Sequence, residues 1–210
     1  MSALAFLTPG AVSESIVAKS PMERLARAAG ARFERRDGWN VAVGYDSAQD
    51  YSGTVAFADR SHLVKLELHG TPPHQLELGM ASPVDGDWWC PVTPQRTLVI
   101  GGPSARDAAL ASGAHVVDLT SGLAAFALIG PLANELLARF CAIDVRPKVS
   151  PVGSFRPGSV ARTPGYVLVE EPDRLLVMVG WALGHYLYEV VADAAERLGG
   201  GPVGTDAADA

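Results

Sequence analysis

Short runs in which apolar and polar residues alternate make up much of this chain. In residues 63–68, Val64, Leu66 and Leu68 alternate with Lys65 and Glu67, which is the two-residue period of a strand with one buried face. Comparable apolar runs bounded by glycine, proline or aspartate predict further strands. These lie at 55–59, 88–92, 97–100, 116–118, 123–129, 166–170 and 175–178.

Helical periodicity is confined to a few segments. The first is predicted at 21–29, where Ser20 precedes Pro21 and the apolar residues share one face, and Gly30 ends it. A hairpin follows, with strands at 31–35 and 39–43 around the Asp37-Gly38 turn, because this dipeptide favours tight hairpin turns. Further helices are predicted at 104–112, 131–140 and 183–198.

The predicted elements recur twice in the same order. Each copy opens with a short strand that ends in Asp59 or Asp118, and each later contains the pattern Pro-x-Arg-x-Leu-Val, at 94–99 and at 172–177. A helix closes each copy. The sequence therefore predicts an α+β fold of two pseudo-repeated strand–helix–hairpin–helix units, about 54–113 and 114–198, of which the first is shortened in its middle.

One folded domain is expected from 20 to 198. Residues 1–19 form an N-terminal leader without the basic start and long apolar run of a secretory signal. Residues 199–210 are rich in glycine and alanine with scattered aspartate, so we expect a disordered tail.

Composition narrows the function classes. The 210 residues are 48% hydrophobic, enough for a substantial core, and the net charge of −6 argues against nucleic-acid binding. No apolar stretch reaches the ~18 residues of a membrane span, so we expect a cytoplasmic protein. Cys90 and Cys141 stand apart and outside any CxxC pattern, which argues against a metal site and favours buried thiols over a disulfide.

Several segments together carry a family resemblance. Residues 57–68 read Phe-Ala-Asp-Arg-Ser-His-Leu-Val-Lys-Leu-Glu-Leu, and 117–120 read Val-Asp-Leu-Thr, leading to Gly-Pro-Leu-Ala at 130–133. These stretches resemble the D-x-S-H-x-x-K/R-L-x-V signature and the later D-x-S to G-P-x-A segment of the glycine-cleavage T-protein family, the folate-binding aminomethyltransferases. The second copy is most similar to the γ subunit of heterotetrameric sarcosine oxidase. Shorter matches lie at 20–21, 31–33, 38–41, 141–145 and 151–153.

The resemblance implies a tetrahydrofolate held in a central channel, where an aspartate on an entering strand positions the reactive pterin nitrogens. A carboxylate in a confined site can hold a cationic amine and steer a proton. The matching segment contains Asp87, the candidate catalytic residue, with Asp85 as the second choice. Asp-Gly-Asp at 85–87 also has the composition of a plain polar turn. The candidate cofactor-binding residues are His62, Tyr166, Glu170 and Trp181.

Other positions depart from the family pattern. Gly101-Gly102-Pro103-Ser104 replaces an asparagine-rich segment, and the glutamate of the family's R-T-G-Y-T-G-E motif is lost or displaced to Glu170. The family's C-terminal barrel is absent from this sequence. These departures argue against a complete transferase.

The leading hypothesis is therefore a tetrahydrofolate-binding-type small subunit of a sarcosine-oxidase-like, amine-demethylating complex in one-carbon metabolism. Its partners would be larger flavin-dependent oxidase subunits, or further copies of itself. The alternative is a stand-alone folate-dependent aminomethyl or methyl transferase acting through Asp87. A scaffold recruited to unrelated chemistry also stays open, since fold does not dictate function. The arginine-rich segment 24–36 would attract a folate polyglutamate tail or an acidic partner, or form an ordinary solvated face.

Overall fold

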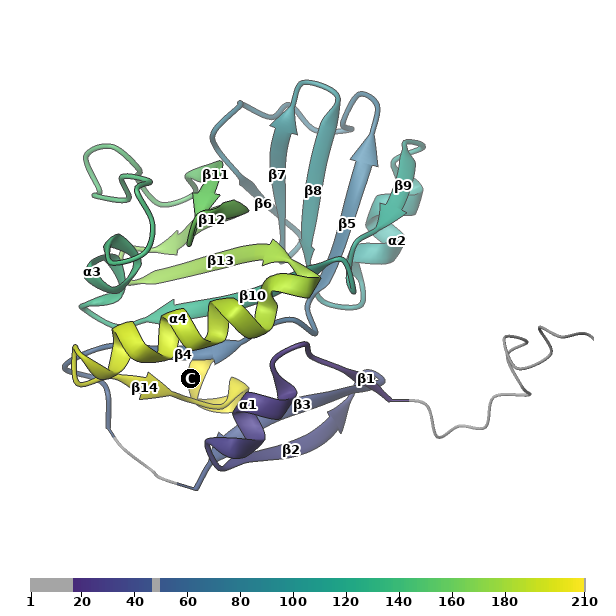
Figure 1. The fold of residues 1–210 in the computed structure, drawn as a ribbon. Coiled ribbons are helices and arrows are strands. Elements are labelled where there is room, and N and C mark those ends of the chain that lie inside the picture. The colour runs from purple at the N-terminus through teal and green to yellow at the C-terminus, as the bar shows by residue number, and fades with distance from the viewer. Residues whose placement is uncertain (1–16, 47–49, 210) are drawn as a thin grey trace, which may run out of the picture.

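The computed structural model describes residues 17–46 and 50–209, so most of the expected leader lies outside the described residues. The described chain forms two large sheets and one small one (Figure 1). In the view of Figure 1, the strands of one large sheet stand upright and those of the other run across. No helix in the described ranges is long and apolar enough to cross a membrane.

The first large sheet has six strands and contains most of the second predicted copy. In spatial order the strands are β11 (Phe155–Val160), β12 (Thr163–Glu171), β13 (Arg174–Gly180), β10 (Leu123–Ile129), β4 (Ala56–Asp59) and β14 (Gly201–Pro202). Strand β10 is antiparallel to both neighbours, β13 and β4. At one edge β14 runs parallel to β4.

The second large sheet has five antiparallel strands and contains most of the first copy. In spatial order they are β6 (Ser82–Val84), β7 (Asp87–Thr93), β8 (Arg96–Gly101), β5 (Val64–His69) and β9 (His115–Asp118). The strand that opens each copy pairs within the other copy's sheet, since β4 lies beside β10 and β9 lies beside β5. The orders β6-β7-β8-β5-β9 and β11-β12-β13-β10-β4 therefore correspond position by position.

The two large sheets pack face to face, and helices cover their outer faces. Leu98 and Ile100 of one sheet share a core with Leu168, Leu176 and Met178 of the other. The outer face of the six-stranded sheet is covered by α3 (Ala133–Ala138) and α4 (Gly184–Glu196), and that of the five-stranded sheet by α2 (Ala105–Ala111). This packing explains why strand alternation alone mispredicts exposure: Lys65 and Glu67 are buried, because the face opposite Val64 meets a second sheet.

A small N-terminal sheet completes the molecule. It contains β1 (Ala18–Lys19), β3 (Trp39–Tyr45) and β2 (Ala31–Arg36), with α1 (Glu23–Ala28) before β2. The predicted hairpin is confirmed: Asp37 and Gly38 have φ of 48° and 81°, the left-handed values of a tight hairpin turn. Cys90 and Cys141 are buried free thiols, as predicted.

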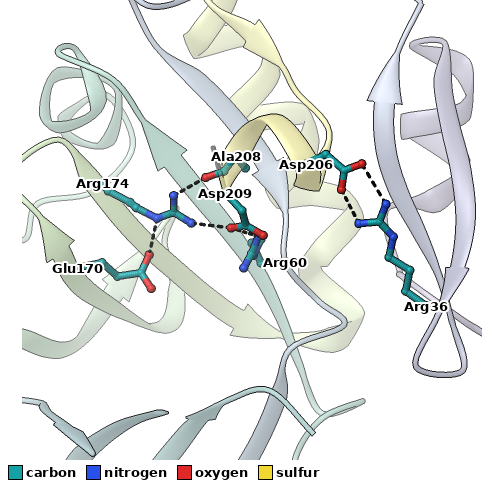
Figure 2. Close-up of polar contacts among 7 residues, drawn as sticks. All are labelled: Arg36, Arg60, Glu170, Arg174, Asp206, Ala208 and Asp209. Atoms are coloured by element: carbon teal, nitrogen blue, oxygen red, sulfur yellow. Dashed lines mark hydrogen bonds and ion pairs between the residues drawn. The ribbon is translucent and has the colours of Figure 1, made fainter. Parts of the chain in front are cut away.

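The predicted disorder of residues 199–210 is wrong for the described part. Gly201–Pro202 form β14, and Thr205–Ala208 form the one-turn helix α5. Composition misled the prediction because glycine here serves close packing: a Cβ on Gly204 would lie 2.0 Å from the carbonyl oxygen of Val43. Ion pairs to Asp206 and Asp209 hold the segment further (Figure 2).

Candidate functional site

Asp87 lies at the start of β7, and the closeness of β8 fixes its position. Its carboxylate packs against Gly101, where an added Cβ would lie 1.7 Å from Asp87 Oδ1. The carboxylate accepts a hydrogen bond from the Gly102 backbone N–H, and only 4% of the residue is exposed. Burial raises the pKa of Asp87; the Gly102 bond opposes the rise and the nearby Asp85 charge adds to it. A glycine at 101 is therefore what allows a carboxylate here.

A cavity of about 440 Å³ adjoins this end of the five-stranded sheet. Gly101 and Gly102 form part of its wall, whereas Asp87 stays behind them and does not line it. Its other lining groups include the rings of Trp39 and His62, together with Arg106 and Thr120. Small-molecule sites have volumes of this order.

His62 reaches this cavity from the loop between β4 and β5. Burial lowers the pKa of His62 to about 4, and the nearby positive charges of Arg60 and Lys65 lower it further. The imidazole is therefore neutral at pH 7. It offers a flat ring and one nitrogen donor, but it is not a cation at that pH.

The loop that holds His62 is fixed by the rest of the Asp-x-Ser-His signature. Asp59 Oδ1 accepts a hydrogen bond from the Ser61 backbone N–H at 2.9 Å, and Ser61 Oγ accepts one from Ala125 N–H at 3.2 Å. Lys65 Nζ donates to the carbonyl oxygens of Ser61 and Leu63 at 2.8 and 2.7 Å. The signature residues around His62 are therefore structural, because their hydrogen bonds stabilise the loop between β4 and β5.

Lys65 itself is a site residue that the sequence reasoning missed. It is fully buried, and burial lowers its pKa to about 7 against the opposing charges of Asp59 and Asp118. Its alternation with apolar residues predicted a solvent-facing side chain. The lysine in the family signature was the available signal, but nothing in the sequence shows that its partners are loop carbonyls.

Trp181 stands behind the cavity wall. It begins the 3₁₀ turn Trp181–Leu183 after β13, and its ring meets that of Trp39 edge-on at 5.8 Å between centroids. Edge-to-face packing of this kind orients both rings. Because Trp39 lines the cavity, Trp181 supports that wall.

Tyr166 lies at a different place. It lines a second cavity of about 430 Å³ together with Val92, Leu123 and Gly180. Its ring stacks on Phe155 at 5.4 Å between centroids. This cavity is an opening at the edge of the apolar layer between the two large sheets.

Glu170 and Asp85 also lie apart from the first cavity. Glu170 accepts a hydrogen bond from Arg174 Nε at 3.3 Å (Figure 2), and burial raises its pKa against the Arg174 charge. Asp85 is exposed, with φ of 52°, in the two-residue turn between β6 and β7, which fits the polar-turn interpretation. The structure thus places His62 at the first cavity, with Trp181 packed behind Trp39 and Asp87 behind Gly101.

The first cavity suits a flat heteroaromatic ligand with an anionic group. Trp39 and His62 provide ring faces, and Arg106 provides positive charge while paired at 2.5 Å with Asp118. Asp37 is its only carboxylate among the described lining residues, and it belongs to an exposed turn.

No protein-family model and no curated protein sequence matches the chain. Solved structures do match. A chain of the heterotetrameric sarcosine oxidase from Corynebacterium sp. U-96 superposes with a TM-score of 0.67 over 85% of this chain and 95% of that chain, at 17% identity. Glycine cleavage system aminomethyltransferase T from Bartonella henselae superposes with a TM-score of 0.72 over 92% of this chain, at 15% identity. The chain has the fold of these two proteins.

The extent of the two matches differs. This chain spans 61% of the length of the aminomethyltransferase but 95% of the matched sarcosine oxidase chain. The fold class predicted from the family signatures is confirmed at the level of architecture. Identity this low carries the fold alone, and function has to be argued from the site.

Proposed function

We propose that this chain is a tetrahydrofolate-binding-type small subunit of a sarcosine-oxidase-like, amine-demethylating complex. The observation that carries the proposal is the structural match to a chain of a heterotetrameric sarcosine oxidase, which covers 85% of this chain and 95% of that chain. The buried position of Asp87 behind Gly101 supports a subunit that does not carry out the transfer alone. Its partners would be larger flavin-dependent subunits, and its setting the cytoplasm.

The first cavity fits part of what a folate requires. Trp39 and His62 would hold the flat ring system, and Arg106 would attract the carboxylates of its tail. Bound tetrahydrofolate would supply the nitrogens that accept a one-carbon unit. Asp37 is the one carboxylate among the described lining residues and belongs to an exposed turn, while Asp87 lies behind Gly101. The chain's own contribution would be to bind the ring and exclude water.

We also infer that the two sheets descend from one duplicated unit. The support is that their strand orders correspond, each with its opening strand paired in the other sheet. Exchange of the opening strands makes each sheet dependent on one strand from the other half. The halves would therefore fold as one domain.

One observation favours the alternative of a stand-alone transferase. Asp87 is a buried carboxyl with a raised pKa and no cationic partner in the part of the chain that the structure describes, and such groups often serve as acids or bases. Under this hypothesis, Asp87 would reach the cavity after Gly101 and Gly102 move. Single-turnover transfer to tetrahydrofolate, compared between the wild type and Asp87→Asn, tests it directly. A loss of transfer with unchanged folate affinity would favour the transferase.

The small-subunit proposal is tested by co-expression with the large flavin-dependent amine-oxidising subunits. A tagged chain should retain them through gel filtration, and Asp87→Asn should assemble as well as the wild type. Retention only of unrelated proteins, or elution of the chain alone, would count against the proposal. Calorimetry of the chain with tetrahydrofolate then determines whether folate affinity belongs to the chain or to the assembly.

A further inference from the structure

Two arginines on the inner face of the six-stranded sheet converge on one carboxylate. Arg60 follows β4, Arg174 begins β13, and β10 lies between those strands. Arg60 Nη1 donates to both oxygens of Asp209, at 2.6 and 2.7 Å, and Arg174 Nη2 donates to Oδ1 at 3.1 Å. Figure 2 shows both guanidinium groups directed at Asp209. Convergent charged donors from two strands are the usual means of recognising a carboxylate.

The arginines belong to the body of the fold, whereas the carboxylate does not. The Arg60 side chain is only 11% exposed and that of Arg174 20%, while the Asp209 side chain is 47% exposed. Arg60 Nε is buried and has no hydrogen-bond partner among the described residues. A buried donor left unpaired is costly, so this site holds more hydrogen-bonding capacity than Asp209 uses.

The segment that carries Asp209 has little apolar anchorage. Helix α5 is a single turn, and its only buried residues are Thr205 and Ala208. Cavities of about 280 and 350 Å³ flank the segment, and Val203 and Ala207 line both. A short helix with hollows on two sides is held mainly by its polar contacts: Arg174 with the Ala208 carbonyl, and Arg36 with Asp206.

We propose that Arg60 and Arg174 form a binding site for a small carboxylic acid, which Asp209 occupies as an internal substitute. Burial raises the pKa of Asp209, but the hydrogen bonds from Arg60 and Arg174 outweigh it and lower the pKa overall. The substitute is therefore an ionised carboxylate at neutral pH. The two flanking cavities are lined by neither Arg60 nor Arg174, so a small molecule would take the place that Asp209 leaves when α5 is displaced. Arg60 and Asp209 are close enough to His62 to affect its pKa, but neither they nor Arg174 line the Trp39–His62 cavity. The proposed site does not depend on the folate proposal.

The first test removes the internal carboxylate. In Asp209→Asn, glutarate measured by calorimetry should bind at least tenfold more tightly than in the wild type, and uncharged glutaramide should not bind. Asp206→Asn is the matched control, because it removes an acidic side chain of the same helix that pairs with Arg36 instead. Adding Arg174→Gln to Asp209→Asn should abolish the gain.

The second test displaces α5 without changing any charge. A Cβ on Gly204 would overlap the backbone of Val43 and Gly44, so Gly204→Ala should move α5 and also strengthen glutarate binding. This variant gives an independent answer if Asp209→Asn does not fold. Equal glutarate affinity in the wild type and either folded variant, or a gain as large in Asp206→Asn, would overturn the proposal. Asp209 would then be only a structural ion-pair partner.

Discussion

Replacing Gly101 by alanine tests the position of Asp87 most simply. The added Cβ would lie 1.7 Å from Asp87 Oδ1, 2.5 Å from its Cγ and 3.0 Å from its Cβ. An aspartate side chain is too short to retract from all three contacts while keeping its bond to Gly102. Gly101→Ala must therefore displace Asp87 or separate β7 from β8.

The cost can be worked from that geometry. Forcing a methyl group into a packed site costs about 1–3 kcal/mol, and the lost hydrogen bond from Gly102 adds roughly 1 kcal/mol. We expect Gly101→Ala to lower the free energy of unfolding by about 2–4 kcal/mol, which for a chain of this size lowers Tm by roughly 4–16 °C. Gly102→Ala is the control, because its Cβ would meet nothing within 4 Å.

A double-mutant cycle separates the clash from other effects of alanine. Urea unfolding of Gly101→Ala, Asp87→Ala and the double variant should show that Asp87→Ala removes most of the penalty at 101, with a coupling of about 1–3 kcal/mol. If the two changes were additive, or if Gly101→Ala were no worse than Gly102→Ala, Asp87 would not occupy the place described, and the argument that it is covered would fail.

Two further predictions concern pH. Burial lowers the pKa of Lys65 in the folded state to about 7 from 10.5, so the unfolded state binds more protons between these two pH values. The free energy of unfolding of the wild type, measured with urea, should therefore rise from pH 7 to 9.5 relative to that of Lys65→Met. Parallel pH profiles for the two proteins would contradict the burial of this lysine. The pKa of His62 in the folded state is lowered to about 4 from 6.5, so the stability of the folded protein should fall as the pH drops from 6.5 to 4. Between pH 7, 5.5 and 4.5, Tm should fall less steeply in His62→Asn than in the wild type. An equal slope in the two proteins would refute the lowered pKa of His62.

The sequence predicted most of the architecture because its signals were local. The Asp37-Gly38 turn and the alternating strands need only neighbouring residues to specify them. The prediction for residues 199–210 was wrong for the opposite reason. The segment is ordered by the close packing of Gly204 against Val43 and by ion pairs to arginines that are distant in the sequence. Such contacts are invisible to composition.

The candidate site was likewise predicted where the signal was local and missed where it depends on tertiary contacts. His62 was found because it stands in a signature, yet the structural role of its neighbours depends on Lys65 reaching back to the loop carbonyls. Tyr166 and Glu170 were grouped with it by resemblance, but strand register puts them at separate places on the six-stranded sheet. Which side chains converge depends on tertiary packing, and it could not be predicted from a single sequence.

The most direct test of the small-subunit proposal is the native mass of the assembly that this chain forms. The chain should be co-expressed with the large flavin-dependent amine-oxidising subunits, purified by a tag on the chain, and weighed by native mass spectrometry. We predict a stable flavin-containing complex with stoichiometric incorporation of this chain, unchanged by Asp87→Asn. A chain that is weighed alone, beside oxidase subunits that are fully assembled without it, would contradict the proposal.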